Sequence, residues 1–142
     1  MNSLFLGVDH IGIAVKDLEA AEDTYANILG FEISGSESLP ERGLEVRFVE
    51  TGNSRLELIG ATSQSSEISG FLEKRGEGIH HICLEVENIE AAVSAMRERG
   101  AKFASKSIER GAHNTKVAFL HPKGTHGVLI ELVEKSKPDE RS

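Results

Sequence analysis

The sequence of 142 residues predicts an α+β fold built from two successive βαβββ modules, and two internal matches carry this prediction. Asp9-His10-Ile11 corresponds to His80-His81-Ile82, an offset of 71 residues. The segment Asp17-Leu18-Glu19-Ala20-Ala21 recurs at the same offset as Asn88-Ile89-Glu90-Ala91-Ala92. A match that keeps its spacing over separate segments indicates a duplicated structural unit.

The first module is predicted from alternation and helical spacing of its apolar residues. Residues 8–15 form a strand that has His10, Gly12 and Ala14 on one face. Asp17 begins a helix that ends at Gly30, which supplies a C-cap. An extended piece at 31–33, a loop at 34–43 and strands at 44–50 and 55–59 complete the module.

The second module is predicted to follow a polar linker at 62–66 and a short helix around Phe71. It contains a strand at 79–86, a helix at 88–99 and extended pieces near 102–108, 115–120 and 127–134. The predicted boundaries are 1–62 for the N-terminal module, 63–77 for the linker with its helix, and 78–134 for the C-terminal module. Together they make one domain over 7–134, with a flexible tail at 135–142.

Composition excludes several classes of protein. The net charge of −7 provides no basic surface for nucleic acid. No apolar run approaches the roughly 20 residues of a membrane span, and no N-terminal signal pattern is present. The single Cys83 cannot form an internal disulfide and fits a reducing compartment as a small buried residue. We therefore expect a soluble cytoplasmic protein that binds neither nucleic acid nor a membrane.

Each module has a His near its start and a Glu near its end. These residues are His10 and Glu57 in the first module, and His81 and Glu131 in the second. A single His is more often a structural residue, and a Glu in a strand often faces solvent. Recurrence of both at matching places favours a metal site, because two imidazoles and two carboxylates suit a divalent first-row metal with open positions.

Several longer stretches around these residues form a recognisable set. They are Val8-Asp9-His10-Ile11-Gly12-Ile13-Ala14-Val15, Leu39-Pro40-Glu41-Arg42-Gly43, Phe71-Leu72-Glu73-Lys74, Gly78-Ile79-His80-His81-Ile82, Gly111-Ala112-His113, Phe119-Leu120-His121-Pro122-Lys123 and Gly127-Val128-Leu129-Ile130-Glu131-Leu132. In these stretches the chain resembles the vicinal oxygen chelate superfamily and, within it, the methylmalonyl-CoA epimerases. The resemblance covers Val8 through Val133.

The resemblance implies paired modules that form a curved sheet around a metal-binding cleft (the glyoxalase-like fold), commonly in a homodimer. It places the metal ligands at His10, Glu57, His81 and Glu131. Cobalt is the expected ion, with manganese, nickel and zinc as alternatives. Some epimerases carry Gln where this chain has Glu57, so the ligand set here should bind the ion well while damping its Lewis acidity.

The implied reaction interconverts the 2R and 2S forms of methylmalonyl-CoA by removing and returning the proton at C2. Glu131 is the first candidate for proton transfer. Glu45 is the second candidate, although the base of some family members corresponds to the next residue, Val46. A displacement of one residue along a strand puts a side chain on the opposite face.

Three rival functions remain open from the sequence. A glyoxalase I-type lactoylglutathione lyase uses the same fold and similar ligands on a hemithioacetal of glutathione. A metal-dependent dioxygenase fits less well, because its sites usually have two His and one carboxylate. A metal-free binding protein of the same fold is the rival from another class, and it predicts that His10 and His81 do not bind metal.

Overall fold

The computed structural model describes residues 4–136, which fall into two compact units. The first unit consists of residues 10–80, and the second combines residues 4–9 with residues 81–136. The helix that follows the predicted linker belongs to the first unit. The start of the first strand belongs to the second unit, where Leu4 packs against the core.

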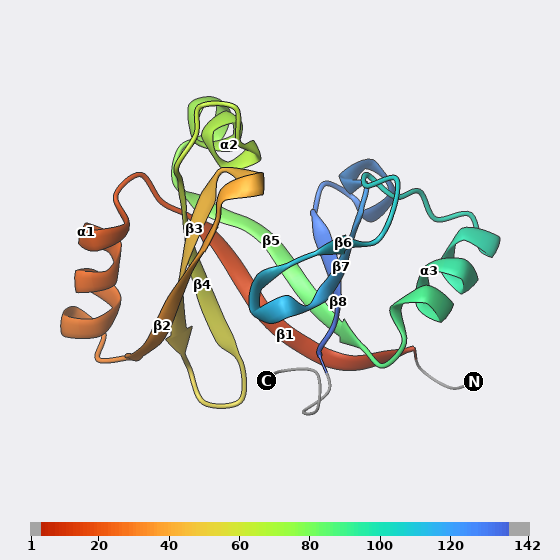
Figure 1. Cartoon of the computed structure of the whole chain (residues 1–142), viewed down its shortest axis with the longest axis horizontal. Coiled ribbons are helices and arrows are strands. Elements are labelled where there is room, and N and C mark those ends of the chain that lie inside the picture. The colour runs from red at the N-terminus through yellow and green to blue at the C-terminus, as the bar shows by residue number, and fades with distance from the viewer. Residues whose placement is uncertain (1–3, 137–142) are drawn as a thin grey trace. The chain divides into compact units, whose positions relative to one another are not determined.

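The first unit contains the strand order β2-β3-β4-β1. The elements are β1 (Phe5–Ala14), α1 (Leu18–Asp23) with a π-helical turn (Thr24–Ile28), β2 (Glu32–Leu39), β3 (Leu44–Glu50), β4 (Arg55–Ala61) and α2 (Glu67–Arg75). Strands β1 and β4 are parallel, and β2, β3 and β4 pair antiparallel. Helix α1 lies against the sheet of this unit (Figure 1) and packs on one face through a core around Val15, Val49 and Leu58. By strand register, His10 and Glu57 lie on the other face.

The second unit contains the strand order β5-β8-β7-β6. Its elements are β5 (Gly78–Val86, which starts in the first unit), α3 (Ile89–Glu98), β6 (Glu109–Arg110), β7 (Lys116–Leu120) and β8 (Ile130–Glu134). Strands β5 and β8 are parallel, and β7 pairs antiparallel with both β8 and β6. Helix α3 buries Ile89, Ala92, Val93 and Met96 against β7 and β8 (Figure 1).

The two units repeat one another in local geometry. Asp17 and Asn88 cap their helices with nearly the same backbone angles, φ/ψ of −132/104° and −137/105°. Each side chain accepts the N–H three residues further on. Gly43 and Asn114, again 71 positions apart, are both left-handed residues that end a short 3-10 turn. The predicted α+β fold of two βαβββ modules is therefore confirmed.

The prediction of a loop or turn over 34–43 is wrong for residues 34–39, whereas Pro40–Arg42 form a 3-10 turn that Gly43 ends. Strand β2 runs through Leu39 and pairs with β3, with a register shift between Ile33 and Gly35. The Ser and Gly residues of this segment signal a turn locally, but β3 supplies backbone partners that a local pattern does not reveal. The extended piece at 102–108 is reduced to a bridge between Phe103 and Leu120, and β6 begins only at Glu109.

The predicted tail is described only at its start. Lys135 Nζ lies 2.9 Å from the buried carboxylate of Asp9 and 3.6 Å from Glu85. The remainder of the tail, 137–142, lies outside the described residues. Among the helices of the described residues, none combines the length and the apolar character that crossing a membrane requires.

Candidate metal centre

The first unit holds one of the two predicted His–Glu pairs. His10 of β1 lies opposite Arg55 of the parallel strand β4, so Glu57 comes two residues later and points to the same face. Nδ1 of His10 is 3.3 Å from Oε2 of Glu57. Both residues are only 5% exposed. The strand register thus brings together two side chains that are 47 positions apart.

The second unit holds the other pair in the same arrangement. Ile82 of β5 lies opposite Ile130 of β8, so Glu131 comes two residues after the position opposite His81. Nε2 of His81 is 3.0 Å from Oε1 of Glu131, and both residues are again 5% exposed. Each unit therefore builds a buried imidazole–carboxylate pair from the same register of two parallel strands.

An aromatic ring lies beside each pair. Phe48 is the cross-strand neighbour of Glu57, and Phe119 is the cross-strand neighbour of Glu131. The Phe119 ring meets the His81 ring edge to face at 6.2 Å. The two phenylalanines are 2% and 7% exposed and lie 71 positions apart. The offset of the repeat could have identified them from the sequence, but they were missed.

Arg55 is a further residue that sequence analysis missed. Its Nη2 and Nε atoms donate hydrogen bonds to Oε2 of Glu57, at 2.8 and 3.1 Å. Its guanidinium lies over the ring of Phe48, 5.4 Å from the ring centre. No sequence motif identifies Arg55, because the repeat points to its partner Glu57 but not to Arg55 itself.

Glu45 lies on the opposite face of the sheet from Glu57. Phe48 pairs with Glu57 across β3 and β4, whereas Glu45 pairs with Gly60 and alternates to the face that α1 covers. The carboxylate of Glu45 contacts Arg47 at 3.1 Å. The structure therefore does not bring Glu45 to the His10–Glu57 pair.

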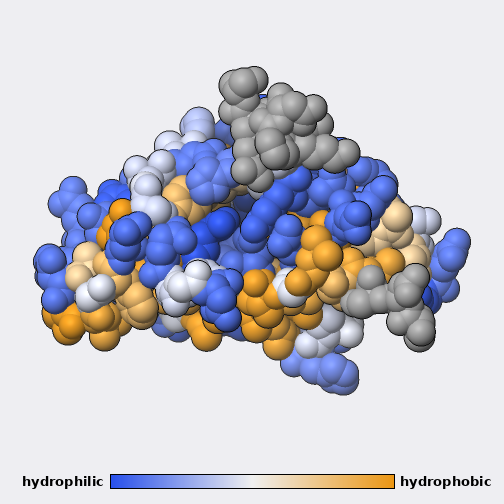
Figure 2. Space-filling model, turned by 90° about the horizontal axis from the view of Figure 1, so that it is seen from below, coloured by the Kyte–Doolittle hydropathy of each residue, from blue (hydrophilic) through white to orange (hydrophobic). Residues whose placement is uncertain are grey.

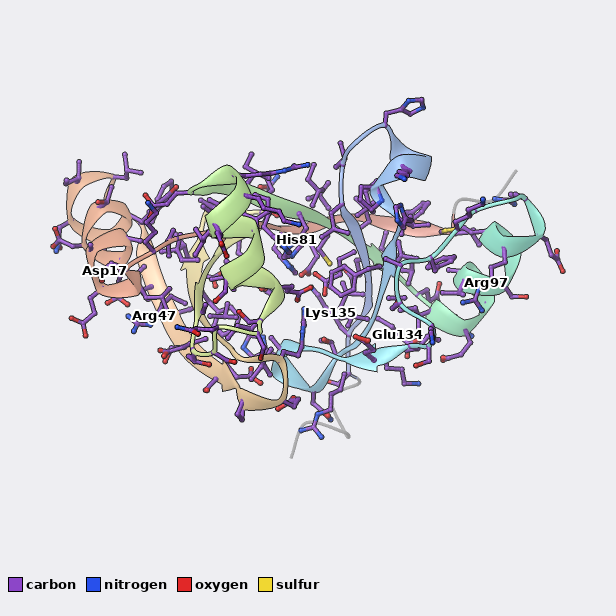
Figure 3. The ribbon with its side chains drawn as sticks, turned by 90° about the horizontal axis from the view of Figure 1, so that it is seen from above. Asp17, Arg47, His81, Arg97, Glu134 and Lys135 are labelled. Carbon is purple, nitrogen blue, oxygen red and sulfur yellow. The ribbon has the colours of Figure 1, made fainter. Side chains whose placement is uncertain are left out.

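Arg47 is held between strand β3 and helix α1 (Figure 3). It contacts Glu22 of the helix at 2.7 Å, and this hydrogen bond raises the pKa of its guanidinium.

On the other face, Glu37 of β2 pairs with Val46 and is the half-buried carboxylate that shares the face of Glu57. Because side chains alternate along a strand, the displacement of one residue from Val46 puts Glu45 on the face opposite to Glu37 and Glu57.

The remaining histidines are not neighbours of these pairs by register. The ring of His80 meets Phe71 of α2 at 5.0 Å, on the face away from His81. Nδ1 of His121 accepts the backbone N–H of Lys123 in a 3-10 turn. His113 lies in the 3-10 turn Ala112–Asn114 and His126 caps the turn Pro122–Thr125, and both have a left-handed backbone.

The two pairs fit a divalent metal ion chemically. Imidazole nitrogen and carboxylate oxygen are ligands that first-row metals accept. A buried carboxylate is unfavourable unless positive charge compensates it; Arg55 does so for Glu57, and a metal ion would add positive charge beside such carboxylates. In each pair an imidazole nitrogen and a carboxylate oxygen lie within 3.3 Å of one another, so the two side chains of a pair can reach the same ion.

Comparison with known proteins gives the same family. Residues 9–119 match the model of the Glyoxalase/Bleomycin resistance protein/Dioxygenase superfamily. The chain is 46% identical over 126 residues to the mitochondrial methylmalonyl-CoA epimerase of Homo sapiens, and this alignment covers 88% of this chain and 72% of that protein. It is 45% identical over 127 residues to the ethylmalonyl-CoA/methylmalonyl-CoA epimerase of Cereibacter sphaeroides, covering 88% and 95%.

Solved structures agree with this result. The methylmalonyl-CoA epimerase of Mycobacterium tuberculosis superposes with a TM-score of 0.94 at 33% identity, over 100% of this chain and 96% of that one. By contrast, the lactoylglutathione lyase of Salmonella typhimurium is only 25% identical over 125 residues, covering 88% of this chain and 90% of that protein. The chain therefore belongs to the Glyoxalase/Bleomycin resistance protein/Dioxygenase superfamily and, within it, to the methylmalonyl-CoA epimerases.

Proposed function

We propose that the protein interconverts (2R)- and (2S)-methylmalonyl-CoA by removing and returning the proton at C2 through an enolate. The repeated, buried His–Glu pair carries the proposal, because metal-assisted proton abstraction beside a thioester needs such a ligand set. Similarity to proteins named methylmalonyl-CoA epimerase supports the choice of substrate.

The proposed metal centre consists of one divalent ion that His10, Glu57, His81 and Glu131 share. The equivalent register of the two pairs supports a shared role for all four residues. Cobalt is the first ion to test, and manganese, nickel and zinc accept the same nitrogen and oxygen ligands. When bound, the ion supplies positive charge that stabilises an enolate oxygen.

The chain's own residues would perform the proton transfer. We assign the removal of the C2 proton to the carboxylate of Glu131, which is buried beside His81. Phe119 and Phe48 would exclude water from the reacting carbon and so strengthen the electrostatic interactions there. Inversion at C2 requires a second acid/base group, which would donate a proton to the opposite face of the planar enolate.

A cytoplasmic homodimer completes the proposal. Phe5, Leu6 and Val8 of β1 are 37%, 60% and 51% exposed, which suits contact with a second copy. Hydrophobic side chains gather along one border of the surface in Figure 2. Light scattering should return the mass of two chains, and Leu6→Glu with Val8→Glu should reduce it to that of one.

The first experiment measures deuterium incorporation at C2 of methylmalonyl-CoA in heavy water by mass spectrometry. Protein stripped with a chelator is compared before and after Co²⁺ is added. We expect incorporation well above background only with the metal. No exchange from protein with verified bound Co²⁺ would refute the epimerase proposal.

The rival functions predict other outcomes in the same assay. A lactoylglutathione lyase would convert the hemithioacetal of methylglyoxal and glutathione while leaving methylmalonyl-CoA unlabelled. A metal-free binding protein would hold neither Co²⁺ nor label, and His10→Ala would leave its ligand affinity unchanged. His10→Ala is therefore measured beside the unmodified protein, because the two metal-dependent functions need His10 and the metal-free function does not.

A further inference from the structure

Arg55 is built into the first His–Glu pair. It lies two residues before Glu57 on β4, so both side chains leave the strand on the same face. The guanidinium is fixed by its two hydrogen bonds to Glu57 and by the ring of Phe48. The Arg55 side chain is only 20% exposed, compared with 6% for Glu57.

The hydrogen bonds from Arg55 reach one oxygen of Glu57. Both guanidinium nitrogens donate to Oε2, and Nδ1 of His10 lies 3.3 Å from the same atom. Each of these contacts joins residues of the first unit. This arrangement fixes the carboxylate while leaving Oε1 to serve as a ligand atom. The two donors lie on one planar guanidinium and meet at one oxygen, so they fix its direction more closely than the freely rotating ammonium group of a lysine would.

The second module differs at the corresponding position. The residue two positions before Glu131 is Leu129, which packs against the cluster of Cys83, Val117 and Val133. An apolar residue therefore stands where β4 carries a guanidinium. The duplication has kept both carboxylates but has placed a positive charge on this position in the first module alone.

The charges of the ligand set explain what Arg55 could do. Two carboxylates cancel the charge of a divalent ion, whereas a set with Gln in place of Glu57 leaves one positive charge. Adding the guanidinium of Arg55 restores that positive charge. Positive charge that remains near the substrate stabilises an enolate as it forms.

We infer that Arg55 is a positioning residue that orients Glu57 and compensates its charge, so that the ion remains as electrophilic as it would be with a neutral ligand. This inference rests on the proposed metal centre. It replaces the expectation that Glu57 damps the Lewis acidity of the ion. Arg55 itself touches neither the substrate nor the reacting carbon in this assignment.

The test measures Co²⁺ affinity by absorbance titration for four proteins: unmodified, Arg55→Gln, Glu57→Gln and the double variant. Arg55→Gln removes a positive charge beside the ligand set, and the weaker repulsion should let this variant bind Co²⁺ about tenfold more tightly. With less positive charge near the substrate, the variant should exchange deuterium more slowly. Glu57→Gln should bind more weakly, and the double variant should return close to the unmodified affinity and exchange rate.

Arg55→Lys is the matched control, because it keeps the charge and loses the paired hydrogen bonds. Its Co²⁺ affinity should stay near that of the unmodified protein because the charge is kept, whereas its deuterium exchange should be slower because Glu57 is no longer held in one orientation. A purely structural role predicts instead that Arg55→Gln weakens binding and that the double variant is no better than Glu57→Gln, which would overturn the inference. Circular dichroism verifies folding. Failure of the unmodified protein to bind Co²⁺ would overturn both this inference and the metal centre, whereas the wrong order among binding variants would overturn the inference alone.

Discussion

Glu57 and Glu131 occupy equivalent strand positions, but their neighbouring side chains differ, and this difference suits the two carboxylates to different roles. Oε2 of Glu57 is tied to Arg55, and that carboxylate suits a fixed ligand. The matching neighbour of Glu131 is the apolar Leu129. This difference favours Glu131 as the carboxylate that moves a proton.

Glu131→Gln should therefore lose more activity than Glu57→Gln does. Loss of a general base costs about 10²- to 10⁴-fold in rate. We expect that loss in deuterium exchange for Glu131→Gln when it is measured at Co²⁺ concentrations that saturate the variant. Metal content is determined on the same samples. If the two variants are slowed equally at full occupancy, Glu131 has no special part in proton transfer.

Glu45 and Glu37 provide a second comparison between carboxylates, on opposite faces of neighbouring strands. Glu45 contacts Arg47 on the face that α1 covers, and Glu37 shares the face of Glu57. Glu45→Gln should leave the exchange rate within about twofold, since strand alternation keeps this carboxylate on the face away from Glu57. Glu37→Gln should slow epimerisation more. The reverse order would show that strand alternation does not determine which carboxylate reaches the substrate.

At the level of elements, the packing of α1 on β4 depends on a glycine. A Cβ added to Gly60 would lie 2.8 Å from Cγ and 2.9 Å from Cδ1 of Leu18. Gly60→Ala should lower the free energy of unfolding by about 1–3 kcal/mol, as overpacking does. Gly70→Ala is the control, because Gly70 lies in α2 with no atom near its added Cβ.

Gly70→Ala should raise the free energy of unfolding by about 0.5–1 kcal/mol, since Ala favours a helix over Gly. Both values come from urea denaturation followed by circular dichroism. An equal effect of the two substitutions would contradict the close contact between Leu18 and Gly60. The pair separates a packing effect from a backbone effect.

The elements also show what the sequence could predict. Helices with a capping residue and apolar spacing were found, because Asp17 and Asn88 act locally. Strand β2 was missed, because its Ser and Gly residues form a strand only by pairing with β3. The four proposed ligands came from the repeat, whereas Arg55 became visible only when the register placed it beside Glu57.

If the two His–Glu pairs share one ion, binding of that ion should stabilise both units of the molecule. Each pair is complete within its own unit, so two separate sites are the alternative to a shared one. A ligand at about 100 times its dissociation constant stabilises a protein by about 2.7 kcal/mol. A shared ion should spread this stabilisation over both units.

Hydrogen–deuterium exchange with and without Co²⁺ distinguishes these alternatives. We expect Co²⁺ to slow amide exchange in β1 and β4 of the first unit and in β5 and β8 of the second. His10→Ala removes a ligand from the first unit only, yet a shared ion requires that it abolish the protection in β5 and β8 as well. His80→Ala, which removes a ring that meets Phe71, should leave the protection intact. Protection that persists in β5 and β8 of His10→Ala would mean that His81 and Glu131 bind an ion of their own.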